Sequence, residues 1–242
     1  MKQRLDVAML GRQLVESRQK AQALILSGKV TVDGQKADKP GHAVAETARI
    51  EIAEPLKYVS RGGLKLEAAL AYFAVDPTGE VCLDVGTSTG GFADCLLQHG
   101  AARVHAVDTG AGQIDWKLRT DPRVILHERF NARYLTPADI GEPVKIITCD
   151  VSFISVTLLI PVLEPLLAPG GDWIVLVKPQ FEVGRELVGK GGIVRDPAAH
   201  HSACTIVATT LNRVGFATKL IPSPILGAEG NREFLLHAVK ET

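Results

Sequence analysis

The residues whose types and spacing point most directly to chemistry are residues 84–92, which read Asp-Val-Gly-Thr-Ser-Thr-Gly-Gly-Phe. An apolar run precedes them and a helical pattern follows, which predicts a strand, a tight turn and the start of a helix. Glycine has no Cβ, so its backbone can approach a ligand closely. The spacing lacks both the Gly-x-Gly-x-x-Gly dinucleotide fingerprint and the Gly-Lys-Ser/Thr of a phosphate loop. An acid followed by Gly-x-x-x-Gly suits a ligand with a cationic amino-acid part, such as S-adenosylmethionine, and an ordinary βα turn without a ligand is the alternative.

Further polar side chains follow other apolar runs. Asp108 ends a second run about 20 residues after the glycine turn, where an aspartate can accept hydrogen bonds from ribose hydroxyls. Asp150 follows Ile-Ile-Thr-Cys and Lys178 follows Ile-Val-Leu-Val. Ligands bind at the carboxyl ends of parallel strands, so these residues are candidates for a site. Solvated loop positions are the competing interpretation.

Elements that could position these residues alternate along the chain from residue 58 onward. Five apolar runs are separated by helical stretches, at residues 81–85, 103–107, 124–128, 145–149 and 173–177. Such alternation predicts a parallel sheet buried on both faces. A long helix over residues 198–214 and two final strands, 218–221 and 234–239, complete the pattern. We therefore predict an α/β fold of the class I methyltransferase type, Rossmann-like, with a seven-stranded, mostly parallel sheet and an antiparallel pair at one edge.

The first 54 residues have a different pattern. Residues 3–26 recur near a helical period, and Ser17 is a candidate N-cap for a helix over residues 18–26. Asp-Gly at 33–34 predicts a hairpin. We predict a small α+β domain at residues 1–54, a linker at 55–59 and the larger domain at 60–242. Residues 1–40 hold eight lysines and arginines against four acids, a net charge of +4.

The amino-acid composition excludes several classes of protein. The 242 residues carry 27 basic and 27 acidic side chains, so the whole molecule is not a polycation. Its four cysteines are far apart, without Cys-x-x-Cys, so we predict no metal site and expect free thiols in a reducing cytoplasm. The first residues lack the apolar core of a signal peptide, and no run of about 18 apolar residues predicts a membrane span.

Four motifs occur in order at residues 60–66, 84–92, 149–155 and 177–182. In this order they resemble the TlyA family of ribosomal-RNA ribose 2′-O-methyltransferases, also described as haemolysin A. The larger domain is similar to FtsJ/RrmJ-type enzymes, and the first part is similar to the RNA-binding domain named for ribosomal protein S-four. The family's linker usually carries a tryptophan, whereas this chain has Tyr58.

The resemblance implies a Lys-Asp-Lys-Glu active site and S-adenosylmethionine as cofactor. The implied catalytic residues are Lys65, Asp150, Lys178 and Glu233, with Glu229 a rival for the last position. The predicted cofactor-binding residues are Ser60, Arg61, Gly62, Asp84, Gly86, Ser88, Thr89, Gly90, Gly91, Phe92, Asp108, Asn131 and Asp150. For Asn131, a loop turn without a ligand is an equal alternative. The expected RNA contacts are Arg4, Arg12, Arg18, Lys20 and Lys29. Without the resemblance, the favoured interpretation of Lys65 is a surface lysine on an amphipathic helix.

Methyl transfer to a ribose hydroxyl needs the hydroxyl proton to leave. A second lysine nearby disfavours the ammonium form of the first, so we expect Lys178 to accept the proton, Lys65 to position the oxygen, Asp150 to orient Lys178, and Glu233 to hold Lys65 or the ribose. Residues 182–197 are glycine-rich, and we expect them to form a lid that touches RNA phosphate; a mobile, solvated connection is the alternative. The expected substrate is cytidine in the RNA of one or both ribosomal subunits. The competing functions are a methyltransferase of another substrate, a membrane-active cytolysin and a non-catalytic RNA-binding assembly factor.

Overall fold

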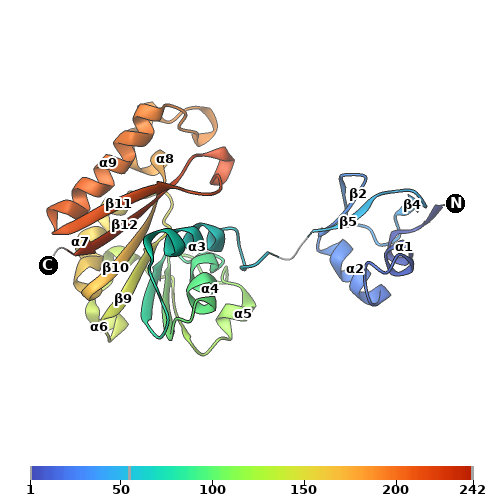
Figure 1. Cartoon of the computed structure of the whole chain (residues 1–242), viewed down its shortest axis with the longest axis horizontal. Coiled ribbons are helices and arrows are strands. Elements are labelled where there is room, and N and C mark those ends of the chain that lie inside the picture. The colour runs from blue at the N-terminus through green and yellow to red at the C-terminus, as the bar shows by residue number, and fades with distance from the viewer. Residues whose placement is uncertain (1, 54–55, 241–242) are drawn as a thin grey trace. The chain divides into compact units, whose positions relative to one another are not determined.

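A computed structural model of the chain describes residues 2–53 and 56–240. The chain divides into two compact units, Met1–Pro55 and Leu56–Thr242. The colour gradient of Figure 1 follows both units along the chain. Residue 55 of the predicted linker lies outside the described residues, as does residue 54 of the predicted first domain. The remaining part of the linker belongs to the second unit, where Tyr58 is buried.

The first unit packs two helices against short strands. The elements are β1 (Lys2–Arg4), α1 (Leu5–Gly11), α2 (Arg18–Leu26), β2 (Val30–Val32), β3 (Gln35–Ala37), β4 (Ala43–Ala45) and β5 (Ile50–Ile52). β1 pairs with β4, and β2 lies between β3 and β5. Helical periodicity from residue 3 was therefore the wrong prediction for residues 3 and 4, because pairing with β4 makes them a strand.

Local signals explain two boundaries in this unit. The Ser17 side chain accepts a hydrogen bond from the Lys20 backbone N–H, which confirms it as the N-cap of α2. Asp33 and Gly34 both have positive φ, 51° and 79°, between the paired residues Val32 and Gln35. This is the two-residue hairpin turn that matches the twist of the strands.

The second unit alternates strands and helices. Along the chain, the first elements of this unit are α3 (Gly62–Phe73), β6 (Val81–Val85), α4 (Gly91–Gln98), β7 (Arg103–Asp108), α5 (Trp116–Arg119), β8 (Val124–Glu128), η1 (Ala132–Tyr134) and α6 (Pro137–Ile140). The elements that follow α6 are β9 (Val144–Cys149), η2 (Val156–Leu158), α7 (Ile160–Leu163), η3 (Glu164–Leu166), β10 (Leu167–Val177), α8 (Pro179–Glu182), η4 (Arg185–Leu187), η5 (Lys190–Gly192), α9 (Pro197–Arg213), β11 (Phe216–Pro222), η6 (Ala228–Gly230) and β12 (Phe234–Lys240).

The seven strands of this unit form one sheet in the order β11-β12-β10-β9-β6-β7-β8. β12 runs antiparallel to both β10 and β11, and the remaining pairs are parallel. The predicted fold class, with its antiparallel pair at one edge, is confirmed. The order reverses direction between β6 and β9, and such a switch point opens a crevice at the carboxyl ends of the strands.

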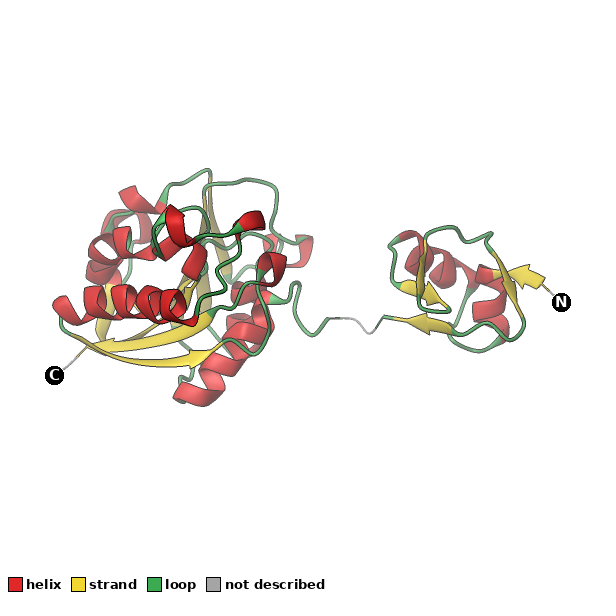
Figure 2. Ribbon diagram, turned by 90° about the horizontal axis from the view of Figure 1, so that it is seen from above, coloured by secondary structure: helices red, strands yellow, loops and turns green. Residues whose placement is uncertain are grey.

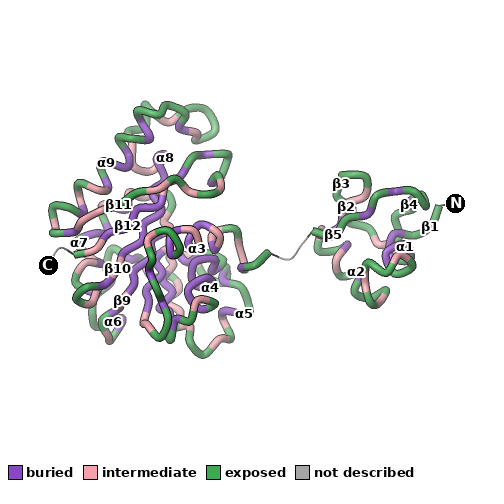
Figure 3. The backbone as a smooth tube through the Cα atoms, in the orientation of Figure 1, coloured by how far each residue is buried: buried purple, intermediate pink, exposed green. Residues whose placement is uncertain are grey.

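Both faces of this sheet are covered by helices, which Figures 1 and 2 show from two directions. Alternate residues of one strand enter different cores: Leu83 of β6 packs with α7 and α9, whereas Cys82 packs with α3 and α4. The buried strands between the two layers are visible in Figure 3. Two-sided burial explains why the strands read as continuous apolar runs. The four cysteines are buried free thiols within this sandwich.

Candidate active site

The turns after β6 and β9 touch at the switch point of the sheet. Gly86 has φ +84°, and a Cβ placed on it would lie 2.5 Å from the backbone oxygen of Asp150. The Asp150 N–H in turn donates to the Val85 carbonyl at 2.9 Å. Only glycine meets both requirements, a left-handed backbone and this close approach. The contact fixes the floor of the crevice.

A pocket of about 540 Å³ opens on one side of this contact. Its volume is typical of a small-molecule site. It is lined by Val85, Gly86, Ser88, Val107, Asp108, Thr109, Gln113, Phe130, Asn131, Ala132, Arg133, Asp150, Val151, Ser152, Phe153, Ile154 and Leu159. The Asp108 carboxylate accepts the N–H groups of Ser88 and Gly110, each at 2.7 Å, and so ties the glycine turn to the end of β7.

A second pocket of about 240 Å³ opens on the other side. It is lined by Ser60, Arg61, Gly62, Lys65, Gly86, Thr87, Ser88, Thr89, Gly91, Phe92, Asp150, Gly227 and Ala228. The two pockets share Gly86, Ser88 and Asp150. They therefore adjoin, and an elongated ligand could occupy both across the glycine turn.

Two residues predicted to bind cofactor do not line either pocket. Asp84 is fully buried beneath the turn, where it accepts a hydrogen bond from the Thr148 hydroxyl at 2.8 Å. Burial raises the pKa of Asp84 to about 7. Gly90 is the N-cap of α4 with φ +96°, and Leu118 occupies the space where its Cβ would be. Both residues shape the turn from below.

The predicted charged residues meet as two ion pairs. Lys65 Nζ lies 2.5 Å from Glu233 Oε2, and their side chains are 11% and 2% exposed. The pair joins α3 to the start of β12, elements separated by most of the unit's sequence. Burial leaves little competing water, so each charge depends on the other.

The second pair joins the ends of β9 and β10. Lys178 Nζ lies 2.5 Å from Asp150 Oδ1, although the angles are not those of a hydrogen bond. Lys178 donates instead to the Ser152 hydroxyl at 2.9 Å. Each lysine thus has its own carboxylate, Asp150 for Lys178 and Glu233 for Lys65.

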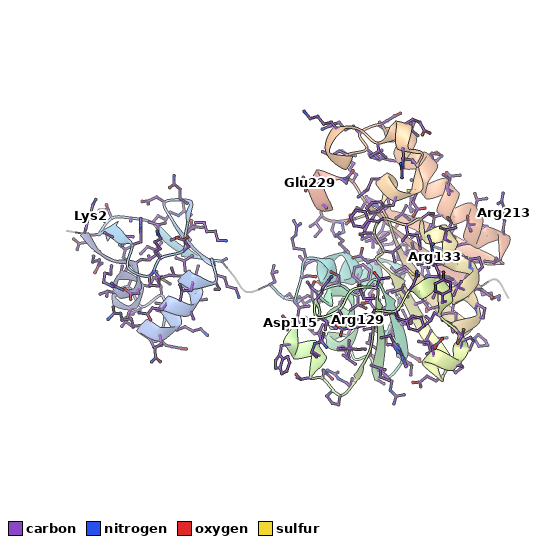
Figure 4. All side chains as sticks on the ribbon, turned by 180° about the vertical axis from the view of Figure 1, so that it is seen from behind. Lys2, Asp115, Arg129, Arg133, Arg213 and Glu229 are labelled. Atoms are coloured by element: carbon purple, nitrogen blue, oxygen red, sulfur yellow. The ribbon has the colours of Figure 1, made fainter. Side chains whose placement is uncertain are left out.

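The turn before β12 distinguishes the two candidate glutamates. Glu233 is buried, with 4% of the whole residue exposed, and its side chain pairs with Lys65. Glu229 is exposed, with φ +53°, and is labelled in Figure 4. A Cβ on Gly227 would lie only 1.9 Å from Glu233 Oε1, so this glycine makes room for the carboxylate.

Several pocket residues were missed by the sequence analysis. Four of them follow the ends of β7 and β8: Thr109, Gln113, Phe130 and Arg133. The rule that ligands bind at the carboxyl ends of parallel strands could have identified them. Arg133 is labelled in Figure 4. Phe153 is 92% exposed at the larger pocket and has φ +64°; an isolated phenylalanine in a sequence gives no signal of such exposure.

In the first unit, three predicted RNA-binding arginines hold the fold together. Arg4 and Arg18 bind the buried carboxylate of Asp6 at 3.0 and 2.9 Å. Their hydrogen bonds keep the pKa of Asp6 well below its usual range, against the opposing effect of burial. Arg12 donates to the backbone oxygens of Ala48 and Glu46. Lys20 and Lys29 are exposed.

The glycine-rich segment at residues 182–197 contains two short 3₁₀ turns, η4 and η5. Its basic residues Arg185, Lys190 and Arg195 are exposed. At its start, Glu182 accepts hydrogen bonds from the Ser155 hydroxyl and the Val156 N–H. Burial raises the pKa of Glu182. This contact joins the segment to the loop that carries Asp150.

The strand order with β12 inserted antiparallel, together with the crevice between β6 and β9, defines a class I methyltransferase fold. A solved S-adenosylmethionine-dependent methyltransferase from Mesorhizobium loti has this fold, with a TM-score of 0.52 at 15% identity over 72% of this chain and 96% of that one. A solved Streptococcus thermophilus protein, described provisionally as a hemolysin, gives a TM-score of 0.76 at 43% identity over 99% of this chain and 88% of that one.

Comparison with related sequences identifies the family within this class of methyltransferases. The profile of the FtsJ-like methyltransferases matches residues 58–240, and that of the S4 domain matches residues 3–50. The 16S/23S rRNA (cytidine-2′-O)-methyltransferase TlyA of Mycobacterium tuberculosis is 44% identical over 96% of this chain and 88% of its own length. Hemolysin A of Brachyspira hyodysenteriae is 42% identical over 98% and 99%. The chain therefore belongs to the FtsJ-like methyltransferases and, among them, to the TlyA family.

The name hemolysin raises the question of membrane insertion. Among residues 2–53 and 56–240, no helix combines the length and the apolar character needed to cross a membrane.

Proposed function

We propose that this protein transfers a methyl group from S-adenosylmethionine to the ribose 2′-hydroxyl of a cytidine in ribosomal RNA of the small subunit, the large subunit or both. The observation that carries the proposal is the Lys178–Asp150 ion pair at the sheet's switch point, where Asp150 lines the larger pocket together with Gly86 of the glycine turn. The M. tuberculosis relative, named for this reaction on both ribosomal RNAs, supports the choice of substrate.

The residues of the crevice fit the cofactor. Asp108 and Asn131 line the larger pocket, where a carboxylate and an amide suit ribose hydroxyls and an adenine edge. The smaller pocket contains the start of α3 and α4 around Gly86, which suits the amino-acid end. Asp150 lies where the pockets meet, so its carboxylate, which pairs with Lys178 through Oδ1, is also placed beside the position of a cationic centre. When bound, S-adenosylmethionine supplies the activated methyl group.

The protein's own part in the reaction is proton transfer and alignment. Lys178 would accept the proton of the ribose hydroxyl as it releases one of its own to Asp150, which its Nζ contacts. Ser152 accepts a hydrogen bond from Lys178 and restricts its direction. The Lys65–Glu233 pair borders the same crevice and would hold the hydroxyl in line with the methyl group. Alignment and proton transfer each commonly contribute factors of about 10²–10⁴ or more.

We further propose that the first unit binds RNA. Arg4, Arg12 and Arg18 hold its fold, so the exposed Lys20 and Lys29 are the better candidates for phosphate contacts. Phosphate contacts position an RNA without specifying its sequence, and they weaken with salt. Arg185, Lys190 and Arg195 of residues 182–197 would add contacts near the reacting ribose.

The test is methyl transfer to ribosomal subunits by Lys178→Ala, with cofactor affinity measured separately by calorimetry. We expect turnover to fall by about 10²-fold or more while cofactor affinity changes little, because Lys178 lines neither pocket. Lys219→Ala, at an exposed lysine on β11, is the matched control. Turnover of Lys178→Ala near the wild-type value would refute the proposed role.

A further inference from the structure

The turn at residues 227–231, which precedes Glu233, is tight and is closed by its own backbone hydrogen bond. The Gly227 N–H donates to the Asn231 carbonyl at 2.9 Å, and Glu229 and Gly230 have φ of +53° and +83°. Asn231 itself is only 3% exposed. A buried amide side chain requires partners, since leaving it without them costs free energy.

The Asn231 side chain finds its partners in two different segments. Its Oδ1 accepts the Val194 N–H at 3.0 Å, and its Nδ2 donates to the carbonyl of Gly192 at 2.9 Å and to that of Ala228 at 3.3 Å. We call these three hydrogen bonds the Asn231 bridge. His200 supports it from α9, because its Nε2 lies 2.9 Å from the Val194 oxygen. The bridge joins residues 182–197 to the turn that leads into β12.

The same turn is shaped around the Glu233 carboxylate. Asn231 is two residues from Glu233, and Gly227 leaves space that a Cβ would take from Glu233 Oε1. Gly227 and Ala228 line the smaller pocket together with Lys65. Movement of this turn would therefore move the carboxylate that holds Lys65.

We propose that Asn231 is a positioning residue, which rests on the function proposed above. It fixes the glycine-rich segment and the turn at 227–231 as one body, and through that turn it sets the position of Glu233 and of Lys65, which lines the smaller pocket. RNA that engages Arg185, Lys190 or Arg195 would then act on the same body that holds the Lys65–Glu233 pair.

The test uses Asn231→Asp in the full chain. This change keeps the side chain's size and the acceptor for Val194, but it places an oxygen against the Gly192 and Ala228 carbonyls. Two quantities are measured: methyl transfer to ribosomal subunits, and trypsin cleavage after Arg185, Lys190 and Arg195, which needs no activity. We expect turnover to fall by roughly 10–100-fold and cleavage to accelerate by about 10-fold or more. Asn212→Asp, at an exposed asparagine of α9, should change neither.

A second background separates positioning from general support of the fold. In Glu233→Gln, the bridge has lost the carboxylate it is proposed to position, so adding Asn231→Asp should lower the residual turnover by less than about 2-fold while still accelerating cleavage. An undiminished effect of Asn231→Asp on turnover in this background would overturn the proposal.

Two further outcomes keep the test decisive. Gly227→Ala displaces Glu233 directly and replaces no donor or acceptor of the three hydrogen bonds of the bridge, so turnover should fall while trypsin cleavage stays at the wild-type rate. If Glu233→Gln retains no measurable turnover, Gly227→Ala takes its place as the deciding variant. Turnover of Gly227→Ala at the wild-type value would then overturn the proposal. Wild-type cleavage rates in Asn231→Asp would also overturn it. Wild-type protein without methyl transfer would instead defeat the proposed function, and the cleavage rates would still decide whether the bridge exists.

Discussion

The Lys65–Glu233 pair gives the sharpest prediction about stability. The two side chains are 11% and 2% exposed and their charged atoms are 2.5 Å apart. Glu233→Gln leaves the Lys65 ammonium buried without its counter-charge, and Lys65→Met leaves the carboxylate in the same state. Removing one partner of a buried pair typically costs about 3–5 kcal/mol.

The double variant distinguishes charge from packing. With Lys65→Met and Glu233→Gln together, no unpaired charge remains buried, and replacing a buried pair by neutral side chains is often close to neutral. We expect each single variant to lower the midpoint of thermal unfolding by roughly 6–20 °C, from a loss of about 3–5 kcal/mol at about 2–4 °C per kcal/mol for a domain of this size. The double variant should recover most of this loss, whereas methyl transfer should stay low in all three.

Tryptophan fluorescence during urea unfolding is a suitable assay. The chain has two tryptophans, Trp116 and Trp173, and both lie in the second unit, so the signal reports that unit alone. Single variants that unfold at the wild-type urea concentration would refute the reasoning, because the pair would then not be a dependent buried pair. A double variant no more stable than the weaker single variant would refute it as well.

Three other predictions follow from the same contacts. Gly86→Ala should abolish measurable cofactor binding by calorimetry, because its Cβ would lie 2.5 Å from the Asp150 oxygen at φ +84°; unchanged affinity would show that the two turns can separate freely. Deleting residues 1–54 should weaken ribosomal-RNA binding in filter assays and spare cofactor affinity, and an unchanged RNA affinity would remove the binding role from the first unit. Burial raises the pKa of Asp84 to about 7 from an unfolded value of about 4, so the folded state binds its proton more tightly. The free energy of unfolding should therefore fall as pH rises through this window, by on the order of 4 kcal/mol relative to Asp84→Asn, and parallel pH profiles of the two proteins would contradict the assignment.

The sequence predicted the second unit well because its signals are local. Apolar runs buried on both faces identified the strands, and the rule that ligands bind at strand ends selected Asp108, Asp150 and Lys178 as candidates. The resemblance supplied Lys65 and Glu233, and the structure then brought these two together across the sheet.

The remaining features depend on contacts between distant segments. Pairing with β4 makes residues 3 and 4 a strand, and the buried Asp6 engages arginines that looked free for RNA. The Asn231 bridge likewise follows from tertiary packing. Periodicity and residue type cannot reveal such pairings, because neither records which segments meet.

The most direct test of the account is to map ribose methylation at nucleotide resolution in unmethylated ribosomal subunits incubated with the protein and S-adenosylmethionine. We predict a 2′-O-methyl group at one or a few cytidines with wild-type protein and with Lys219→Ala, and its near absence with Lys178→Ala. Methylation of a base in place of a ribose, or equal ribose methylation by Lys178→Ala, would contradict it.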